Sequence, residues 1–307
     1  MIWLGVLRKL RNGIVLMDGS KSTLEETRTV DWLFWVYNTI TLIFLILMGK
    51  RIENRWLFAF SNLALILISL LFIRFKVNGF SWSGIRILRN GYPYLFFFYL
   101  HWESGMIRKI FHALPFDPVV QQWDLAIFGV HPHSVLSQFQ PLWFTELIHF
   151  GYFFYYILML LPAILFYRKD LTAFRRFLFD ISLLYLIHYF IFYAFPVHGP
   201  IEHHYNTFTN GILFEPIMKI IYSIGDSPGG AMPSSHVSIA VLSWCWLLVK
   251  RKRLALILAP LVLCLVFSTV YLSYHYAIDA IVGVAFGLLF FILMQWLRAK
   301  YPKVEFI

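Results

Sequence analysis

The chain has 307 residues, of which 60% are hydrophobic and only 14% are charged, and its mean hydropathy is +0.69. A soluble domain of this length has no room to bury so much apolar surface, so the composition excludes a soluble protein and predicts one embedded in a bilayer. The formal net charge of +10 would suit nucleic-acid binding. However, the basic residues lie at the ends of apolar segments, so we expect no nucleic-acid partner.

The chain begins with "MIWLGVLRKLRNG". The apolar run before its basic residues is too short for a cleaved signal peptide. We expect residues 1–32 to form an interfacial amphipathic segment.

Apolar segments that fit membrane spans follow along the rest of the chain, at 33–48, 57–73, 92–107, 144–167, 177–196, 236–250, 254–271 and 276–297. Some are shorter than the roughly 20 residues that a straight span needs, so we expect six to eight crossings. Lipid offers no hydrogen bonds and no segment alternates like a strand, so the segments must be helices. The sequence therefore predicts an all-α, polytopic membrane bundle that forms a single domain over 1–307.

The basic residues predict an orientation. They gather at alternate ends of the apolar segments, at 167–170, 175–176, 250–253 and 298–303. The segments 114–143 and 272–275 contain no Lys or Arg, and 197–235 contains only Lys219. By the positive-inside rule, the first set is cytoplasmic and the second faces outward or into a lumen. Arg108, Lys109 and the loop 50–55 do not fit this scheme.

The stretch "GGAMPSSHVS" at 229–238 leads into the apolar segment 236–250. Pro233 suits a helix start, and Ser234 or Ser235 is a typical N-cap. The free N–H groups of a first helical turn and the helix dipole form a ready anion site. A phosphate bound there would lie beside His236, which could donate a proton to a leaving oxygen. The alternative is an ordinary capped helix with a solvated histidine.

A second polar pattern, "YLSYHYAID", precedes the last apolar segment. His275 and Asp279 are spaced i, i+4, so their side chains share a helix face, and the carboxylate can accept a hydrogen bond that orients the imidazole. The alternative is a buried pair that only anchors the helix. Two crossings separate His236 from His275, so both reach the same membrane face, where "FPVHGP" at 195–200 also opens.

These motifs resemble a known family. "PSSH" and "HYAID" are similar to two signature motifs of the type-2 phosphatidic acid phosphatase superfamily of membrane enzymes. "FDPVVQQWDLAIFGVHP" at 116–132, "GYFFYYILMLLP" at 151–162 and "PVHGP" at 196–200 resemble the branch that contains inositol phosphorylceramide synthases and their bacterial relatives.

The resemblance implies a six-helix catalytic core, here 90–298, with two extra N-terminal helices in 33–89 and a cytoplasmic tail at 299–307. It implies phosphoryl chemistry through a phosphohistidine, without a metal or other cofactor. His275 would be the nucleophile, oriented by Asp279, and His236 the acid. We expect Ser234, Ser235, Gly199 and Gly230 to bind the phosphate or substrate.

The chain departs from the phosphatase form of the superfamily, which has a Lys/Arg-Pro motif first and an arginine six residues before the nucleophilic histidine. Here that second position is Thr269, and "PVHGP" contains no Lys or Arg. Such a site would depend on amides, hydroxyls and histidines, and on Arg108 or Lys109 if they reach it. It would suit a phosphodiester, which carries one negative charge against about two for a monoester.

Other polar residues allow simpler interpretations. His198, His203 and His204 in "VHGPIEHHY" read as solvated or substrate-contacting loop residues rather than metal ligands. His101 and Glu103 line the substrate cavity or satisfy each other. We expect structural roles for most of the remaining residues: His188 as a core histidine, Cys245 and Cys264 as small core residues, and Gly283 and Gly287 as points of close helix packing. Asp226 would form a turn or contact a headgroup, and Asp117 and Asp124 would form the acidic edge of an interfacial helix.

The leading hypothesis is a membrane phosphotransferase that moves an inositol-phosphate-like headgroup from a phospholipid to a lipid alcohol such as ceramide. With water as acceptor, the same site would be a lipid phosphatase acting on phosphatidate or polyprenyl-phosphate-type substrates. The rival from another class is a transporter with intramembrane polar groups, although neither inverted repeats nor broken helices are evident. The oligomeric state is not predicted.

Overall fold

The computed structural model of the chain describes residues 28–77, 83–225 and 227–302. Most of the expected interfacial segment 1–32, Asp226 and residues 303–307 of the expected tail lie outside the described residues. The elements, in chain order, are α2 (Thr29–Met48), η2 (Gly49–Arg51), α3 (Arg55–Val77), α4 (Ser83–Phe111), α5 (Asp117–Phe128), α6 (Pro132–Leu136), α7 (Leu142–Lys169), α8 (Leu171–Ala194), α9 (Ile201–Thr207), α10 (Phe214–Gly225), α11 (Ser235–Lys250), α12 (Lys252–Tyr271) and α13 (Ala277–Lys300).

The predicted all-α membrane fold is confirmed. Each apolar segment of the sequence corresponds to one helix, namely α2, α3, α4, α7, α8, α11, α12 and α13. In the described part of the chain, 6 helices are long and apolar enough to cross a membrane, and the apolar α11 is shorter. The predicted span 177–196 extends two residues beyond its helix, since α8 ends at Ala194. The helix ends there because Phe195 precedes a proline, and the residue before a proline disfavours the helical conformation.

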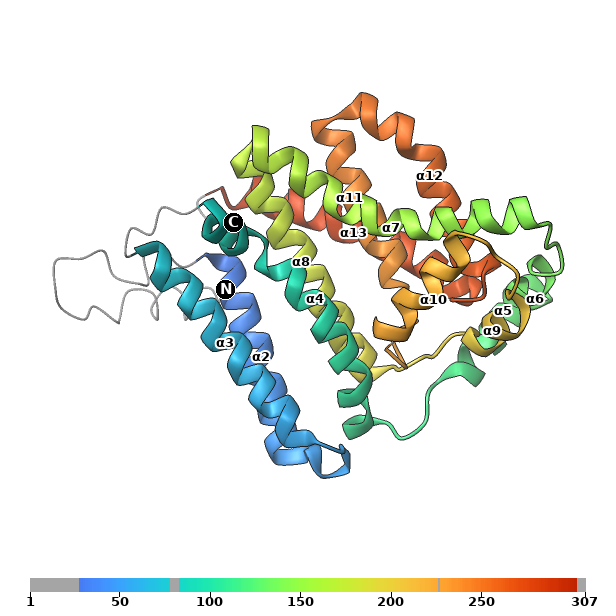
Figure 1. The fold of residues 1–307 in the computed structure, drawn as a ribbon, viewed down its shortest axis with the longest axis horizontal. Coiled ribbons are helices and arrows are strands. Elements are labelled where there is room, and N and C mark those ends of the chain that lie inside the picture. Colours follow the sequence, from blue (N-terminus) through green and yellow to red (C-terminus); the bar gives the residue numbers. More distant parts are fainter. Residues whose placement is uncertain (1–27, 78–82, 226, 303–307) are drawn as a thin grey trace.

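The helices form a bundle in which α2 and α3 lie together beside α4 and α8 (Figure 1). Polar contacts inside the apolar bundle hold this pair. On α2, the buried Asp31 accepts hydrogen bonds from Arg89 (2.5 and 2.8 Å) and Tyr92 (2.6 Å) of α4. On α3, Asn62 donates to Glu103 of α4 at 2.5 Å. In a lipid environment such contacts favour association of helices that the hydrophobic effect alone would not select.

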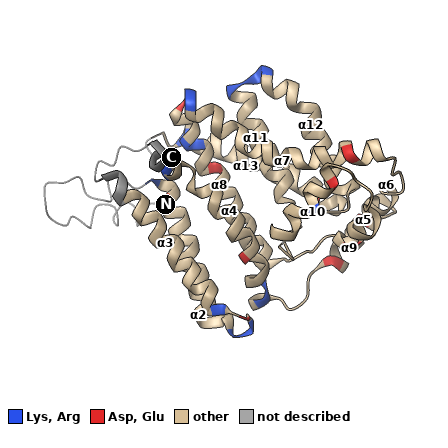
Figure 2. Cartoon of the chain, viewed as in Figure 1, with Lys and Arg blue, Asp and Glu red and all other residues tan. Residues whose placement is uncertain are grey.

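The Lys and Arg residues gather at two opposite ends of the bundle (Figure 2). The α7–α8 and α11–α12 junctions share one end, where Lys250 forms an ion pair of 2.9 Å with Asp170. The opposite end carries the turn between α2 and α3 and the end of α4, with Arg108 and Lys109. These are the residues that did not fit the positive-inside pattern. The assignment of the first end to the cytoplasm stays a prediction.

The short helices α5, α6, α9 and α10 lie at the end opposite the α11–α12 junction (Figure 1). There the loop after α8 meets the loop before α11 in a short parallel bridge. Val197 donates its N–H to Gly229 O at 3.1 Å, and Ala231 donates to Val197 O at 2.9 Å. This bridge brings "PVHGP" beside "GGAMP", as expected from their common membrane face.

Helix α13 crosses α11 at very short distance. A Cβ atom at Gly283 would lie 2.9 Å from Ser234 O, and one at Gly287 would lie 2.6 Å from Ser238 O. Real Cβ atoms do not approach backbone oxygens so closely, so both glycines are needed for this packing. The predicted role of the two glycines is confirmed. The crossing also places the beginning of α13 against the beginning of α11.

Candidate active site

His236 and His275 lie at the same end of the bundle and face each other. His236 lies in the first turn of α11, and His275 lies just before α13. Their ring centroids are 6.0 Å apart, with an angle of 61° between the ring planes. The juxtaposition predicted from the two crossings is therefore observed, and both rings line one cavity.

The two nitrogens of His275 have different neighbours. Nε2 lies 3.1 Å from the Ser234 hydroxyl. Nδ1 lies 3.6 Å from Asp279 Oδ2, which is longer than a hydrogen bond. The expected hydrogen bond between this pair is thus absent, because Oδ2 instead accepts the backbone N–H of Tyr276 at 3.0 Å as part of a capping box. The carboxylate still lies close enough to favour a proton on Nδ1 and to leave Nε2 unprotonated.

Ser234, rather than Ser235, is the N-cap of α11. Its hydroxyl oxygen accepts the N–H of Val237 at 3.3 Å, and its own N–H donates to Asp279 O at 3.1 Å. Ser234 therefore connects the starts of α11 and α13 while its hydroxyl contacts His275. Ser235 is buried and lines the cavity.

The two glycines expected at the phosphate differ in position. Gly230 lines the cavity, and a Cβ there would lie 3.2 Å from Cε1 of His101. Gly199 has φ +78°, and a Cβ there would lie 2.6 Å from Tyr274 O. It is not among the residues that line the cavity, and its N–H already donates to Asp117 at 2.9 Å. Its contribution is therefore to the shape of the loop.

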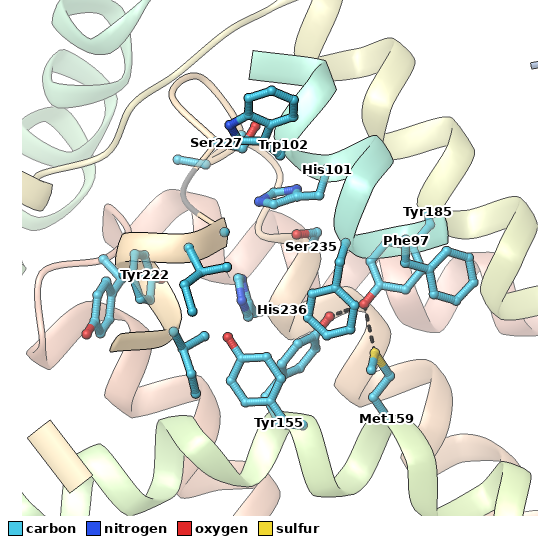
Figure 3. Close-up of a pocket in the computed structure, with 18 of the residues that line it drawn as sticks. Phe97, His101, Trp102, Tyr155, Met159, Tyr185, Tyr222, Ser227, Ser235 and His236 are labelled. Atoms are coloured by element: carbon cyan, nitrogen blue, oxygen red, sulfur yellow. Dashed lines mark hydrogen bonds between the residues drawn. The ribbon is translucent and has the colours of Figure 1, made fainter. Parts of the chain in front are cut away.

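The cavity has a volume of about 490 Å³ and two unlike ends. His198, Ser235, His236 and His275 line the polar end. Aromatic and aliphatic side chains of α4, α7, α8 and α10 make up most of the remaining lining, and Figure 3 shows Tyr155 beside His236, with the two ring centroids 4.4 Å apart. Of the lining residues, Phe98 on α4 is 55% exposed and Ile224 on α10 is 78% exposed, so the cavity reaches the outer surface of the bundle between these helices.

Two carboxylates that the sequence left without a role hold the site loops. Asp117 accepts the N–H groups of His198 and Gly199, each at 2.9 Å. Asp124 accepts those of Ala277 and Ile278 at 3.0 and 2.9 Å, and so caps α13 directly after His275. Both lie on α5, seven residues apart and so on one face of the helix. In the sequence, the two acidic residues in a segment without Lys or Arg indicated a helix with an acidic edge, but not the groups that this edge would bind.

Arg108 reaches the site from the end of α4, as the sequence analysis allowed. Its Nε donates to Pro228 O at 2.7 Å, and its Nη2 lies 3.0 Å from Nε2 of His198. Thr269 has a different role from the arginine it replaces. Its carbonyl accepts the N–H groups of Tyr274 and His275 at 3.0 and 2.9 Å, while its hydroxyl bonds within α12.

Three other polar residues that the sequence singled out, His101, Glu103 and His188, lie inside the bundle. His101 lines the cavity, but Glu103 bonds to Asn62 and Tyr99, so the two do not satisfy each other. His188 is buried and contacts Ser238 at 2.9 Å, as expected of a core histidine.

The predicted loop position of His203 and His204 is wrong, because both lie in α9 and His204 is buried. Each bonds to a protein group. His203 contacts Ser137 at 2.9 Å. His204 donates to Leu272 O at 2.6 Å, and burial lowers the pKa of its imidazole to about 3, so this ring is neutral at physiological pH.

A family model described as the PAP2 superfamily matches residues 120–293. This range is more than half of the chain and contains His236, His275 and Asp279, whereas Arg108 and Asp117 precede it. No curated protein and no solved structure matches the chain.

Proposed function

Because the chain belongs to the PAP2 superfamily, we propose that it is a membrane-embedded phosphotransferase that moves a phospho-headgroup from a phospholipid to a lipid alcohol. The observation that carries this proposal is the pair of imidazoles 6.0 Å apart at the polar end of a largely apolar cavity. His275 is the proposed nucleophile and His236 the proposed acid and base.

In the first step, Nε2 of His275 attacks the phosphorus atom and forms a P–N bond. The bond from phosphorus to the diacylglycerol-like oxygen breaks, and His236 gives its proton to that oxygen. Asp279 stabilises the positive charge that develops on the His275 ring, since its carboxylate is 3.6 Å from Nδ1. Ser234, now hydrogen-bonded to Nε2, must turn its hydroxyl toward the phosphate as attack begins.

In the second step, the hydroxyl of the acceptor lipid gives its proton to His236 and its oxygen attacks phosphorus. The P–N bond breaks, His275 returns to its neutral form, and His236 is again protonated. Atoms and charges balance without a metal or redox partner. The N–H groups at the start of α11 and the Ser235 hydroxyl supply hydrogen bonds to the phosphoryl oxygens.

The cavity supports a lipid substrate, because most of its lining is apolar and it reaches the outer surface between α4 and α10. The sparse positive charge supports a phosphodiester over a monoester. In the matched range, the described Lys and Arg residues lie at the end of the bundle that carries the α7–α8 and α11–α12 junctions, opposite the candidate site. The exception is Lys219, which pairs with Glu215. An inositol-phosphate-like headgroup and a ceramide-type acceptor are what the resemblance implies.

Water in place of the lipid alcohol would make the same machinery a lipid phosphatase for phosphatidate or polyprenyl-phosphate-type substrates. This is the alternative, because the family match reaches the superfamily and not a branch of it. The match also favours an enzyme over a transporter.

The test is to incubate the purified protein with a panel of phospholipids, with and without a ceramide-type alcohol, and to identify the products by mass spectrometry. A new phospholipid supports transfer, and free phosphate supports hydrolysis. His275→Ala should lower turnover by about 10³-fold or more while leaving the thermal unfolding midpoint nearly unchanged. His112→Ala, in a loop away from the cavity, is the control. Unchanged turnover in His275→Ala would refute the proposed chemistry.

A further inference from the structure

Arg108 contacts the polar end of the cavity through His198, which lines it. Its side chain is only 5% exposed and lies over Gly229, where any Cβ would overlap it. Gly229 has φ +103°, which glycine adopts without strain. The loop before α11 is thus shaped around this guanidinium.

The contact between Arg108 and His198 has a defined polarity. A guanidinium has only N–H donors, so at 3.0 Å Nη2 donates and Nε2 of His198 accepts. His198 is therefore neutral, with its ring proton on Nδ1. Its ring lines the cavity that also contains His236 and His275. A fixed positive charge lies directly behind a cavity-lining imidazole.

The positive charge of Arg108 could balance the negative charge of a phosphate bound in the cavity. A phosphate between His236 and His275 needs a nearby positive charge, because an anion removed from water is costly unless it is paired. The described Lys and Arg residues of the matched range do not supply this charge, because they lie at the opposite end of the bundle or, for Lys219, pair with Glu215. Arg108 comes from α4, before that range. One of its nitrogens, Nη1, is buried without a hydrogen-bond partner among the described residues.

We propose that Arg108 is a positioning residue for the phosphate: it holds His198 as the neutral tautomer with its proton on Nδ1 and places the positive charge of the site behind it. The proposal rests on the proposed function for the identity of the anion. It identifies the residue that replaces the positive charge missing at Thr269 and in "PVHGP".

The groups around His198 allow this role. Asp117 accepts the backbone N–H of His198 at 2.9 Å, but it also accepts the Gly199 N–H and the Tyr276 hydroxyl, so its charge is shared by three donors. His101, His236 and His275 line the same cavity. Among the described residues that line the cavity there is no Asp or Glu.

The test compares four variants of the full-length protein with a phosphodiester lipid between pH 5 and pH 8. In Arg108→Gln, the site loses its charge, and at pH 8 we expect KM to rise about ten- to hundredfold with a smaller change in kcat. Without the donor from Arg108, Nε2 of His198 can take a proton. The ratio of the variant KM to the wild-type KM should therefore fall toward one as the pH is lowered from 8 to 5.

Arg108→Lys keeps the charge and should give an intermediate KM at pH 8. The double variant Arg108→Gln/His198→Asn should keep its high KM ratio at pH 5, since it lacks the imidazole of His198 that would take the proton. Lys109→Gln removes the same charge from the exposed neighbouring position and should leave KM unchanged. A purely structural Arg108 would instead lower the unfolding midpoint and show no pH-dependent recovery.

A second measurement separates this inference from the proposed function. Binding of inorganic phosphate to the same proteins, followed by line broadening in phosphorus NMR, needs no turnover. If the wild type turns over lipid but Arg108→Gln has an unchanged KM at every pH, the inference is overturned and the function stands. If no lipid is turned over but phosphate binding depends on Arg108 and recovers at low pH, the anion site stands and the proposed function fails. Phosphate binding that is equal in both proteins overturns the inference.

Discussion

At the scale of single residues, two side chains of the candidate site each have two contacts, one that caps a helix and one with His275. Asp279 caps α13 through Tyr276 and also lies 3.6 Å from His275. Ser234 caps α11 and contacts the same imidazole. Each role by itself is ordinary helix chemistry. Both residues also contact His275, which two independently capped helices would not require.

Asp279→Asn tests which of the two roles of Asp279 matters for turnover. Asparagine keeps an oxygen that can accept the Tyr276 N–H, but it has no charge to stabilise the imidazolium and the phosphohistidine. We expect kcat to fall by about 10²- to 10⁴-fold, with a small change in the unfolding midpoint. Asp170→Asn is the matched control, since Asp170 caps α8 at the far end of the bundle and should not affect kcat. A loss of stability without a loss of kcat would show that Asp279 only anchors the helix.

At the scale of elements, two features bring the motifs together. The glycine face of α13 lets it cross α11 at backbone contact. Helix α5 then holds two of these segments through hydrogen bonds. Its Asp117 accepts a backbone N–H from the loop after α8, and its Asp124 accepts one from the start of α13. The short helix α5 thus links two motifs that are far apart in the sequence.

Gly283→Ala tests the crossing. The added Cβ would lie 2.9 Å from Ser234 O and 3.3 Å from Ser234 Cβ, so α13 must move away from the N-cap that contacts His275. We expect kcat to fall at least tenfold and the unfolding midpoint to drop, since overpacking costs about 1–3 kcal/mol. Gly91→Ala is the same substitution in a helix with nothing within 4 Å of the new Cβ, and it should keep full activity. Full activity in Gly283→Ala would show that the close approach is not needed.

At the scale of the whole molecule, the bundle separates two chemical environments. One end carries the basic α7–α8 and α11–α12 junctions, and the other carries the short helices and the candidate site (Figure 2). The aromatic cavity connects the polar end to the outer surface of the bundle between α4 and α10. Under the proposed function, a lipid keeps its tails in the bilayer while its headgroup lies between the two histidines.

Cysteine labelling tests the predicted orientation. Lys252→Cys lies at the basic end and Ile212→Cys, 77% exposed in the native chain, at the end with the site. We expect a membrane-impermeant maleimide to label Ile212→Cys on intact cells or sealed vesicles with the native orientation, and Lys252→Cys only after permeabilisation. The unsubstituted chain gives the background from Cys245 and Cys264. Reversed labelling would place the site on the cytoplasmic face, and labelling of both from one side would contradict the bundle.

The sequence by itself determined the helical membrane fold, the capped start of α11 and the common membrane face of His236 and His275. These features depend on local patterns: apolar runs long enough for the bilayer, N-cap residues at a helix start, and a count of crossings. Each can be read from neighbouring residues, without knowledge of how the helices pack.

Only the tertiary structure decided which distant groups support the two histidines. Arg108 and His198 are separated by 90 positions, and Asp124 and Ala277 by 153. Whether such groups meet depends on helix crossing angles and on how closely glycines let backbones approach, and no local pattern encodes these distances. The same reason explains why Gly199, a plausible phosphate ligand in the sequence, proves to donate its N–H to Asp117.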